Sequence, residues 1–177
     1  MTLQRKYGFH LLFLIWLGCV PVLGNAQTCT DNLVKIADDR FTDQEDGTVY
    51  DTQTGLLWMR CAYGTEWKTG QCKENPLLVS WSDSLTLAGE QTFAGYVDWQ
   101  LPNVNELQSL VEWACVNPAI NTTAFASVNG GRYWSSTARQ VVGDSTKGVV
   151  LTVDFFNGRI RDESLNSGYV LFVRHPE

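Results

Sequence analysis

The sequence predicts an α+β domain built from short antiparallel strands and two helices. Short segments with strand patterns are separated by turn signals, Asp46-Gly47 in the first half and Asn157-Gly158 near the end. Two amphipathic segments in the middle of the chain each begin after a residue type that caps helices. Four cysteines remain after an N-terminal targeting segment, and they offer two disulfides to hold these elements together.

The first strands are expected over residues 40–60. Residues 40–51 have the pattern of a strand, a turn at Asp46-Gly47 and a second strand, because Asp-Gly is a strong signal for a hairpin turn. Residues 54–60 follow after a short gap and predict a further strand.

A first helix is expected to begin after Ser80, whose hydroxyl suits the N-cap position. Trp81, Leu85 and Ala88 then recur at i, i+4 and i+7, which is the spacing of one helical face. This spacing predicts that the three side chains are buried together against the rest of the domain.

The second helix has clearer signals at both ends. Pro102 and Asn103 precede it, and Glu106 lies three residues after Asn103, which is a capping-box spacing with Asn as the cap. The expected apolar face consists of Leu107, Leu110, Val111 and Ala114. Asn117-Pro118 is expected to end the helix, because a residue before proline disfavours the helical conformation.

The last part of the chain returns to strand patterns. Residues 133–136 predict a short strand, and residues 149–156 and 159–161 predict a hairpin. The Asn157-Gly158 pair between them favours a two-residue loop in a type I′ turn, where both residues take positive φ. Residues 169–174 predict a final strand that is paired in a sheet rather than frayed.

The charge of the chain argues against several classes of partner. The 177 residues carry a formal net charge of −6. Removing Arg5 and Lys6 with the targeting segment leaves 11 basic and 19 acidic residues, a net charge of −8. Such an acidic domain lacks the electrostatic footprint of a nucleic-acid binder or of a protein that docks on anionic membranes. No nucleic acid is therefore expected among its partners.

Residues 1–26 are expected to be a secretory signal peptide. Arg5 and Lys6 precede a compact apolar run over residues 11–17, and Gly24-Asn25-Ala26 supplies small residues at −3 and −1 of a cleavage site. The apolar stretch is too short for a membrane span, which needs about 20 residues. Cleavage after Ala26 would leave one domain over residues 27–177.

The alternative to cleavage after Ala26, which would give a soluble protein, is a lipid anchor attached to Cys19. Leu17-Gly18-Cys19 resembles the end of a lipoprotein signal, although Trp16 stands where leucine is usual. Both alternatives predict an exported protein that is periplasmic, displayed at the cell surface or secreted. Contact with a membrane is expected only through the signal peptide or through a lipid on Cys19.

In an oxidising compartment, four cysteines favour two disulfides, with three possible pairings. Cys61 and Cys72 bracket a short polar loop, so a bridge between them is favoured, and Cys29 would then join Cys115. A zinc site is disfavoured, because the spacings contain no Cys-x2-Cys pair and both histidines lie near the ends of the chain.

No residue set for catalysis is found, and the domain is predicted not to be an enzyme. His175 is the single histidine after residue 26, so a nucleophile activated by histidine is not expected. No Gly-rich nucleotide loop occurs, and no cofactor is expected. The acidic run from Asp43 to Asp46 fails the pattern of a calcium loop, because Gly47 comes fifth and Thr54 stands twelfth. A solvated turn is expected there, with a weak ion site left open.

Ligand-contacting side chains are expected in the loops, which carry function in scaffolded domains. Most of the six tryptophans after residue 26 are expected in the core, but Trp67 lies in the polar loop between the paired cysteines and is a candidate for an exposed contact. Arg139, Arg159 and Arg161 are further candidates in the last part of the chain. Acidic residues in the same stretch leave a plain solvated surface as the alternative.

Several segments, taken in chain order, resemble one family, the Lcl C-terminal domain, which is named after a bacterial collagen-like adhesin. They are Arg40-Phe-Thr-Asp43, Asp46-Gly-Thr-Val-Tyr-Asp51, Thr54-Gly-Leu-Leu-Trp58, Phe93-Ala-Gly-Tyr-Val-Asp-Trp-Gln-Leu-Pro-Asn103, Glu106-Leu-Gln-Ser-Leu110, Pro118-Ala-Ile-Asn-Thr122, Tyr133-Trp-Ser-Ser-Thr137 and Tyr169-Val-Leu-Phe-Val-Arg174. The resemblance covers nearly the whole chain after the targeting segment, and its ordered set of motifs is specific.

The resemblance implies an exported bacterial protein with a C-type-lectin-like fold, of the kind shared with formylglycine-generating enzymes. This chain departs from that pattern at three points. Gln100 stands where the family usually has arginine, no cysteine follows Cys115 for the copper chemistry of the enzyme branch, and Leu101-Pro102-Asn103 lacks the preceding acid or amide of calcium-dependent lectins. Neither the enzyme activity nor metal-dependent sugar binding therefore carries over. The named adhesin binds sulfated glycosaminoglycans. Such polyanions are not the expected ligand here, because the domain carries a net charge of −8.

The leading hypothesis is a lectin-like or adhesin-like binding domain that recognises a glycan or a surface protein. The alternative is a structural or assembly subunit of the cell envelope or of a pilus-type surface structure, for which a stable oligomer or a co-purifying envelope protein is expected. Fold alone does not give the ligand, so the choice depends on the site.

Overall fold

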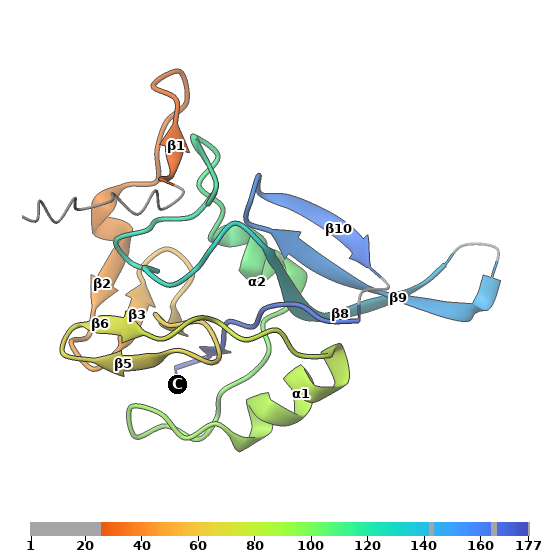
Figure 1. Ribbon diagram of the computed structural model, residues 1–177. Helices are drawn as coiled ribbons and strands as arrows, with labels where there is room; N and C mark the ends of the chain where they lie inside the picture. Colours follow the sequence, from red (N-terminus) through yellow and green to blue (C-terminus); the bar gives the residue numbers. More distant parts are fainter. Residues whose placement is uncertain (1–25, 142–143, 164–165, 177) are drawn as a thin grey trace, which may run out of the picture.

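The computed structural model describes residues 26–141, 144–163 and 166–176 (Figure 1). It confirms the α+β class, with short antiparallel strands, the helices α1 (Trp81–Glu90) and α2 (Val104–Ser109) and, within these ranges, one 3-10 turn, η1 (Asp38–Arg40). The expected signal peptide lies outside the described residues apart from Ala26, as does Cys19. None of the helices in these ranges is long and apolar enough to cross a membrane.

The first sheet has the strand order β11-β4-β3-β2, with β2 Phe41–Asp43, β3 Thr48–Asp51, β4 Leu56–Met59 and β11 Val173–Arg174. The expected strand, turn and strand over residues 40–51 are confirmed. The last strand is paired with β4, but it is shorter than predicted. Tyr169 makes an isolated bridge to the second sheet, so the chain crosses between sheets before it reaches β11.

The second sheet has the order β10-β9-β8, with β8 Arg132–Val141, β9 Asp144–Asp154 and β10 Arg159–Glu163. The hairpin is confirmed, but its two-residue type I′ turn is wrong. Asp154 pairs with Arg159, so residues 155–158 form a four-residue loop. Gly158 has φ +76° and donates its N–H to Asp154 O at 2.7 Å, whereas a type I′ turn needs positive φ at Asn157 as well.

Helix α2 (Val104–Ser109) begins with the predicted capping box: the Asn103 side chain accepts from the N–H of Glu106, and the Glu106 carboxylate accepts from the N–H of Asn103. The expected apolar face is buried, but the predicted end at Asn117-Pro118 is wrong. The chain leaves the helix after Ser109, because the next residues pair with a later segment: Val111 bridges Ile120, and the N–H of Glu112 donates to Ala119 O at 3.0 Å. The Glu112 carboxylate accepts from the N–H of Ile36 at 2.8 Å.

Helix α1 (Trp81–Glu90) is capped by Ser80, whose hydroxyl accepts from the N–H of Asp83. Its buried face differs from the prediction, since Leu85 is 40% exposed while Ser84 is fully buried. Ser84 tolerates burial because its hydroxyl donates to Trp81 O at 2.6 Å. The buried face therefore follows Trp81, Ser84 and Ala88, and Leu85 points away from it.

Two small antiparallel pairs are each joined to a disulfide, and the four cysteines pair as the sequence favours. β1 (Thr28–Cys29) pairs with β7 (Cys115–Val116), and Cys29 is bonded to Cys115. β5 (Glu66–Lys68) pairs with β6 (Gln71–Lys73), and Cys72 at its centre is bonded to Cys61. The disulfides thus fix an N-terminal segment and a hairpin to the body of the domain.

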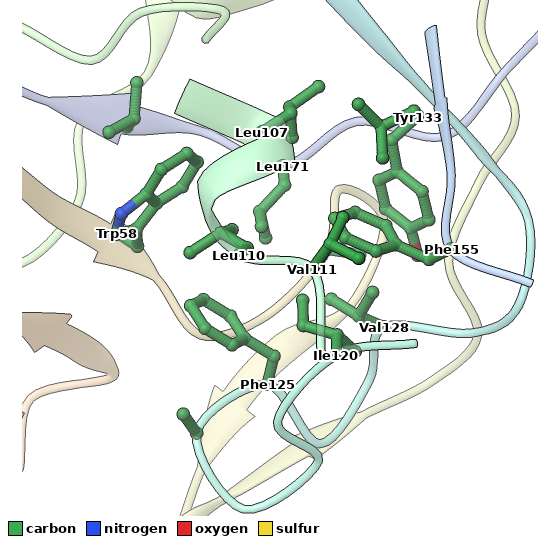
Figure 2. Packing of buried hydrophobic residues seen from close by; sticks show 14 of the residues in the cluster. Trp58, Leu107, Leu110, Val111, Ile120, Phe125, Val128, Tyr133, Phe155 and Leu171 are labelled. Atoms are coloured by element: carbon green, nitrogen blue, oxygen red, sulfur yellow. The ribbon is translucent and has the colours of Figure 1, made fainter. Parts of the chain in front are cut away.

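The core consists of two clusters because adjacent residues on a strand point to opposite faces. In β4, Leu56 and Trp58 enter the first cluster, while Leu57 and Met59 enter the second. Figure 2 shows the first cluster, where Leu107 and Leu110 lie between Trp58 on one side and Tyr133 and Phe155 on the other. Strand β4 is therefore an inner strand of the first sheet that is buried on both faces.

Candidate functional site

Trp67 is half-buried rather than freely exposed, and three neighbours hold its indole ring. The ring lies over Gly47, in whose place any larger residue would put a Cβ 2.6 Å from Trp67 Cγ and 2.7 Å from Phe93 Cζ. The Arg60 guanidinium lies 4.9 Å from the Trp67 ring centroid, which is the distance of a cation–π contact. Trp67 therefore attaches the β5–β6 hairpin to the turn between β2 and β3.

Arg60 is itself fixed by the surrounding backbone. Its Nε donates to Ala124 O at 3.0 Å and its Nη2 donates to Thr123 O at 2.8 Å. Its Nη1 forms an ion pair with Asp43. A guanidinium held at three points has little freedom to move, so the indole that it covers is also pre-positioned.

A cavity of about 360 Å³ lies beside Trp67. Its aromatic walls come from three separate parts of the chain, with Tyr63 and Trp67 near the disulfide hairpin, Phe93 after α1 and Phe172 before β11. Glu66 and Gln91 contribute polar groups to the same cavity. Walls that combine apolar and aromatic side chains with a few polar groups are typical of small-molecule sites, whose volumes run from about 300 to 1,000 Å³.

We expect Gly47→Ala to destabilise the domain by about 1–3 kcal/mol, because the new methyl group overlaps Trp67 and Phe93. Gly70→Ala is the matched control, since Gly70 also has positive φ (+78°) but an added Cβ there meets nothing within 4 Å. Urea unfolding measures both variants. Equal losses of stability would mean that backbone strain, and not the contact with Trp67, explains the effect.

The three arginines expected near a ligand do not lie together. Residues paired across antiparallel strands point to the same face of the sheet. Arg159 is opposite Asp154 and Arg161 is opposite Thr152, so both lie on one face of β10. Arg139 is opposite Val149 and lies on the other face, where it forms an ion pair with Asp162.

Arg161 also has an unusual environment. Its Nε lies 3.8 Å from Asp154 Oδ2, which is too long for a hydrogen bond. Arg161 Nε and Thr152 Oγ1 are buried and have no hydrogen-bond partner among the described residues. Figure 1 shows the β8–β10 sheet on the opposite side of the molecule from the β5–β6 hairpin, so these arginines do not contribute to the Trp67 cavity.

The acidic turn uses its carboxylates internally. Asp46 Oδ1 accepts from the N–H and the hydroxyl of Thr48, and Asp43 accepts from the N–H of Glu45 in addition to its ion pair with Arg60. Within the described residues, no group of three or more His, Cys, Asp or Glu side chains lies together where it could hold a metal ion. The turn at Asp46-Gly47 thus serves to position Arg60 and Trp67.

Comparison with known proteins gives one family. The model of the Lcl C-terminal domain matches residues 47–174, which is most of the chain. This chain belongs to the Lcl C-terminal domain family. Neither the curated proteins nor the solved structures gave a match to it. In this Lcl C-terminal domain, the matched range includes all the residues that line the Trp67 cavity. The two disulfides suggest an extracytoplasmic location, because such bonds persist in oxidising compartments.

Sequence reasoning identified Trp67 in this Lcl C-terminal domain but not the residues that surround it. Tyr63, Phe93 and Phe172 are far apart in the sequence, and no spacing rule brings them to one cavity. Gly47 is the one local signal, because a glycine at this turn also admits the rings of Trp67 and Phe93. Trp113 was also missed as an exposed side chain, since it is 57% exposed although it follows α2 closely.

Proposed function

We propose that this Lcl C-terminal domain is an exported, non-enzymatic binding module whose Trp67 cavity holds one sugar unit of a glycan. The observation that supports the proposal is the aromatic cavity of about 360 Å³ built around a pre-positioned indole. The two disulfides support the extracytoplasmic part of the proposal, because such bonds persist in oxidising compartments.

A sugar matches this cavity for a chemical reason. One face of a pyranose presents C–H groups that pack on aromatic rings, and its rim presents hydroxyls that need hydrogen-bond partners. Trp67 and Tyr63 offer the rings, while the Gln91 amide and the Glu66 carboxylate offer polar partners. The Glu66 carboxylate also forms an exposed ion pair with Lys68, at 2.7 Å, and this pairing raises the pKa of the Lys68 ammonium.

A C-type-lectin-like fold, implied by the family resemblance, would suit this role but stays a prediction. Trp67 lies opposite Cys72, which is bonded to Cys61, and Phe172 is buried in the core, so a ligand would have little conformational freedom to remove on binding. No catalytic step is proposed, because the cavity walls include no histidine or free cysteine that could act as a nucleophile or its base.

Screening against immobilised glycans tests the proposal. We expect a saturable ligand whose affinity falls about tenfold or more in Trp67→Ala, which corresponds to about 1.4 kcal/mol of lost contact. Gln91→Ala supplies a second variant that leaves the disulfide hairpin intact. Trp113→Ala is the control, because it removes an exposed indole outside the cavity. A glycan that bound Trp67→Ala and wild type equally would contradict the proposal.

The alternative, an assembly subunit, is supported by a different observation. Trp113, Val116 and Phe156 are large apolar side chains that remain 57%, 42% and 49% exposed. Where such side chains form one contiguous patch, they are typical of surfaces that contact other proteins. Under this alternative, light scattering would show a stable oligomer that Phe156→Asp dissociates, and the glycan screen would give no saturable ligand.

A further inference from the structure

A second cavity, of about 540 Å³, lies between residues 117–130 and Tyr169 and shares no residue with the Trp67 cavity. Its polar walls come from Asn117, Asn129, Ser127 and Gln27, and no charged side chain lines it. We propose that this cavity is a further binding site and that it takes a neutral sugar unit. This inference goes beyond the proposed function, since it assigns a separate site with its own recognition groups.

The buried Tyr133 hydroxyl fixes the position of Asn129 and leaves its side-chain amide nitrogen available to a ligand. Its backbone N–H donates to the Tyr133 hydroxyl at 3.2 Å, and that hydroxyl donates to Asn129 Oδ1 at 3.3 Å. Tyr133 is fully buried, and burial raises the pKa of its hydroxyl, so it remains a proton donor. Asn129 Nδ2 has no acceptor among the described residues, which leaves two N–H donors beside the cavity.

Asn117 supplies a second amide on the neighbouring wall. Its backbone N–H donates to Phe156 O at 2.9 Å, which fixes the residue at φ +50°. Gly130 allows the two walls to meet, because a Cβ there would lie 2.6 Å from Asn117 Oδ1. None of the hydrogen bonds within the described residues uses the Asn117 side chain, so both its donor and its acceptor remain available.

Tyr169 adds an aromatic surface to these amides. Its ring packs on Tyr133 with centroids 5.4 Å apart and planes tilted by 31°. Gly131 passes directly against it, since a Cβ there would lie 2.6 Å from Tyr169 Cε2. The ring is half-buried and lines the cavity, so it is positioned by the core rather than by a ligand.

Gln27 closes the cavity from the N-terminal segment. Its Nε2 donates to Pro118 O and to Ile120 O, both at 2.7 Å. Cys29 follows two residues later and is bonded to Cys115, which ties this wall to the body of the domain. The cavity is therefore assembled from the N-terminal segment, the segment after α2 and the segment that leads to β11.

The lining selects for a neutral, hydroxyl-rich ligand. The Asn117 amide offers a donor and an acceptor side by side, which matches two adjacent hydroxyls of a sugar, and Asn129 Nδ2 adds further donors. Because no cation lines the cavity, a sulfated or carboxylated sugar would lose water around its charge without gaining a partner. The aromatic ring and the volume fit a ligand of sugar size.

The test is an NMR titration of the ¹⁵N-labelled domain with the methyl glycosides of glucose, galactose, mannose and N-acetylglucosamine. We expect at least one of them to shift the side-chain amide signals of Asn117 and Asn129 saturably. Asn129→Asp keeps the shape and the acceptor but removes the Nδ2 donor, and should weaken binding about tenfold or more. Asn157→Asp makes the same change in a turn outside the cavity and should leave binding unchanged.

Two results would overturn the inference. One is the absence of saturable shifts at Asn117 and Asn129 with all four glycosides. The other is a response of these signals to glucuronate or to triglycine but to none of the neutral sugars. Trp67→Ala separates this site from the proposed one, because it should weaken binding in the first cavity about tenfold or more and leave the Asn129 shifts intact.

Discussion

Replacing Asp51 with asparagine should lower the free energy of unfolding by about 3–5 kcal/mol, the largest effect we expect from one substitution. The Asp51 carboxylate is fully buried and accepts from Arg40 Nε at 2.8 Å and from Arg40 Nη2 at 2.6 Å. It also accepts from the Thr54 hydroxyl and from the N–H of Gln53. The amide leaves the nearly buried Arg40 charge without its counterion, and urea unfolding at neutral pH measures the loss.

The same pair predicts a pH dependence. Burial alone would raise the pKa of the Asp51 carboxyl, but the hydrogen bonds from Arg40 and Thr54 and the Arg40 charge outweigh it and lower the pKa below 3.8. The unfolded chain therefore binds this proton at higher pH than the folded domain does. The stabilisation is complete above the unfolded pKa of about 3.9 and is lost as pH falls through the folded pKa. The difference between wild type and Asp51→Asn should shrink in strong acid.

Asp98→Asn is the matched control for Asp51→Asn. Asp98 also accepts two hydrogen bonds from one guanidinium, from Arg174 Nε at 2.8 Å and from Arg174 Nη2 at 3.0 Å, and Arg174 lowers its pKa. Its side chain is 49% exposed, so solvent screens the pair and the substitution should change stability little. Equal losses for the two variants would show that burial does not set the strength of the Arg40–Asp51 pair.

Removing a disulfide should cost about 2–5 kcal/mol for each bridge lost. Cys29–Cys115 closes 86 residues and carries the N-terminal segment, which otherwise depends on hydrogen bonds from Gln27, Thr30 and Ile36. Cys61–Cys72 spans 11 residues and holds the hairpin that carries Trp67. Its loss should therefore weaken glycan binding as well as stability.

Paired substitutions of each disulfide by alanine, followed by urea unfolding, measure these costs separately. Intact mass of protein recovered from the cell envelope, before and after reduction, shows whether both bridges form in the cell. We expect a gain of four hydrogens on reduction, from two bridges. Four free thiols in the exported protein would contradict the role given to the disulfides. The same spectrum distinguishes a start at Gln27 from a lipidated start at Cys19.

The parts of the fold that follow local rules could be predicted from the sequence. The Asn103–Glu106 capping box, the Ser80 cap and the Asp46-Gly47 turn depend on neighbouring residues only, and all three are present. The cysteine pairing also followed from spacing, because Cys61 and Cys72 are close in the chain.

The parts that depend on contacts between distant segments could not be predicted. Leu85 matched a helical face but points outward, because Ser84 satisfies its own hydroxyl and takes the buried position. Helix α2 ends where Val111 and Glu112 form backbone pairs with Ile120 and Ala119, a contact that no local signal in the sequence predicts. Arg139 and Arg161 belong to opposite faces of one sheet, since pairing with β9 sets their directions.

The most direct test of the central claim is an NMR titration that follows the six tryptophan indole N–H signals of the chain from Gln27 onward with the glycan that the screen selects. Trp67→Phe assigns the signal of Trp67. We predict that this signal shifts saturably while the signals of the buried Trp58 and Trp134 stay in place. A bound glycan that leaves the Trp67 signal unmoved, or that shifts Trp113 instead, would contradict the assignment of the Trp67 cavity as the binding site.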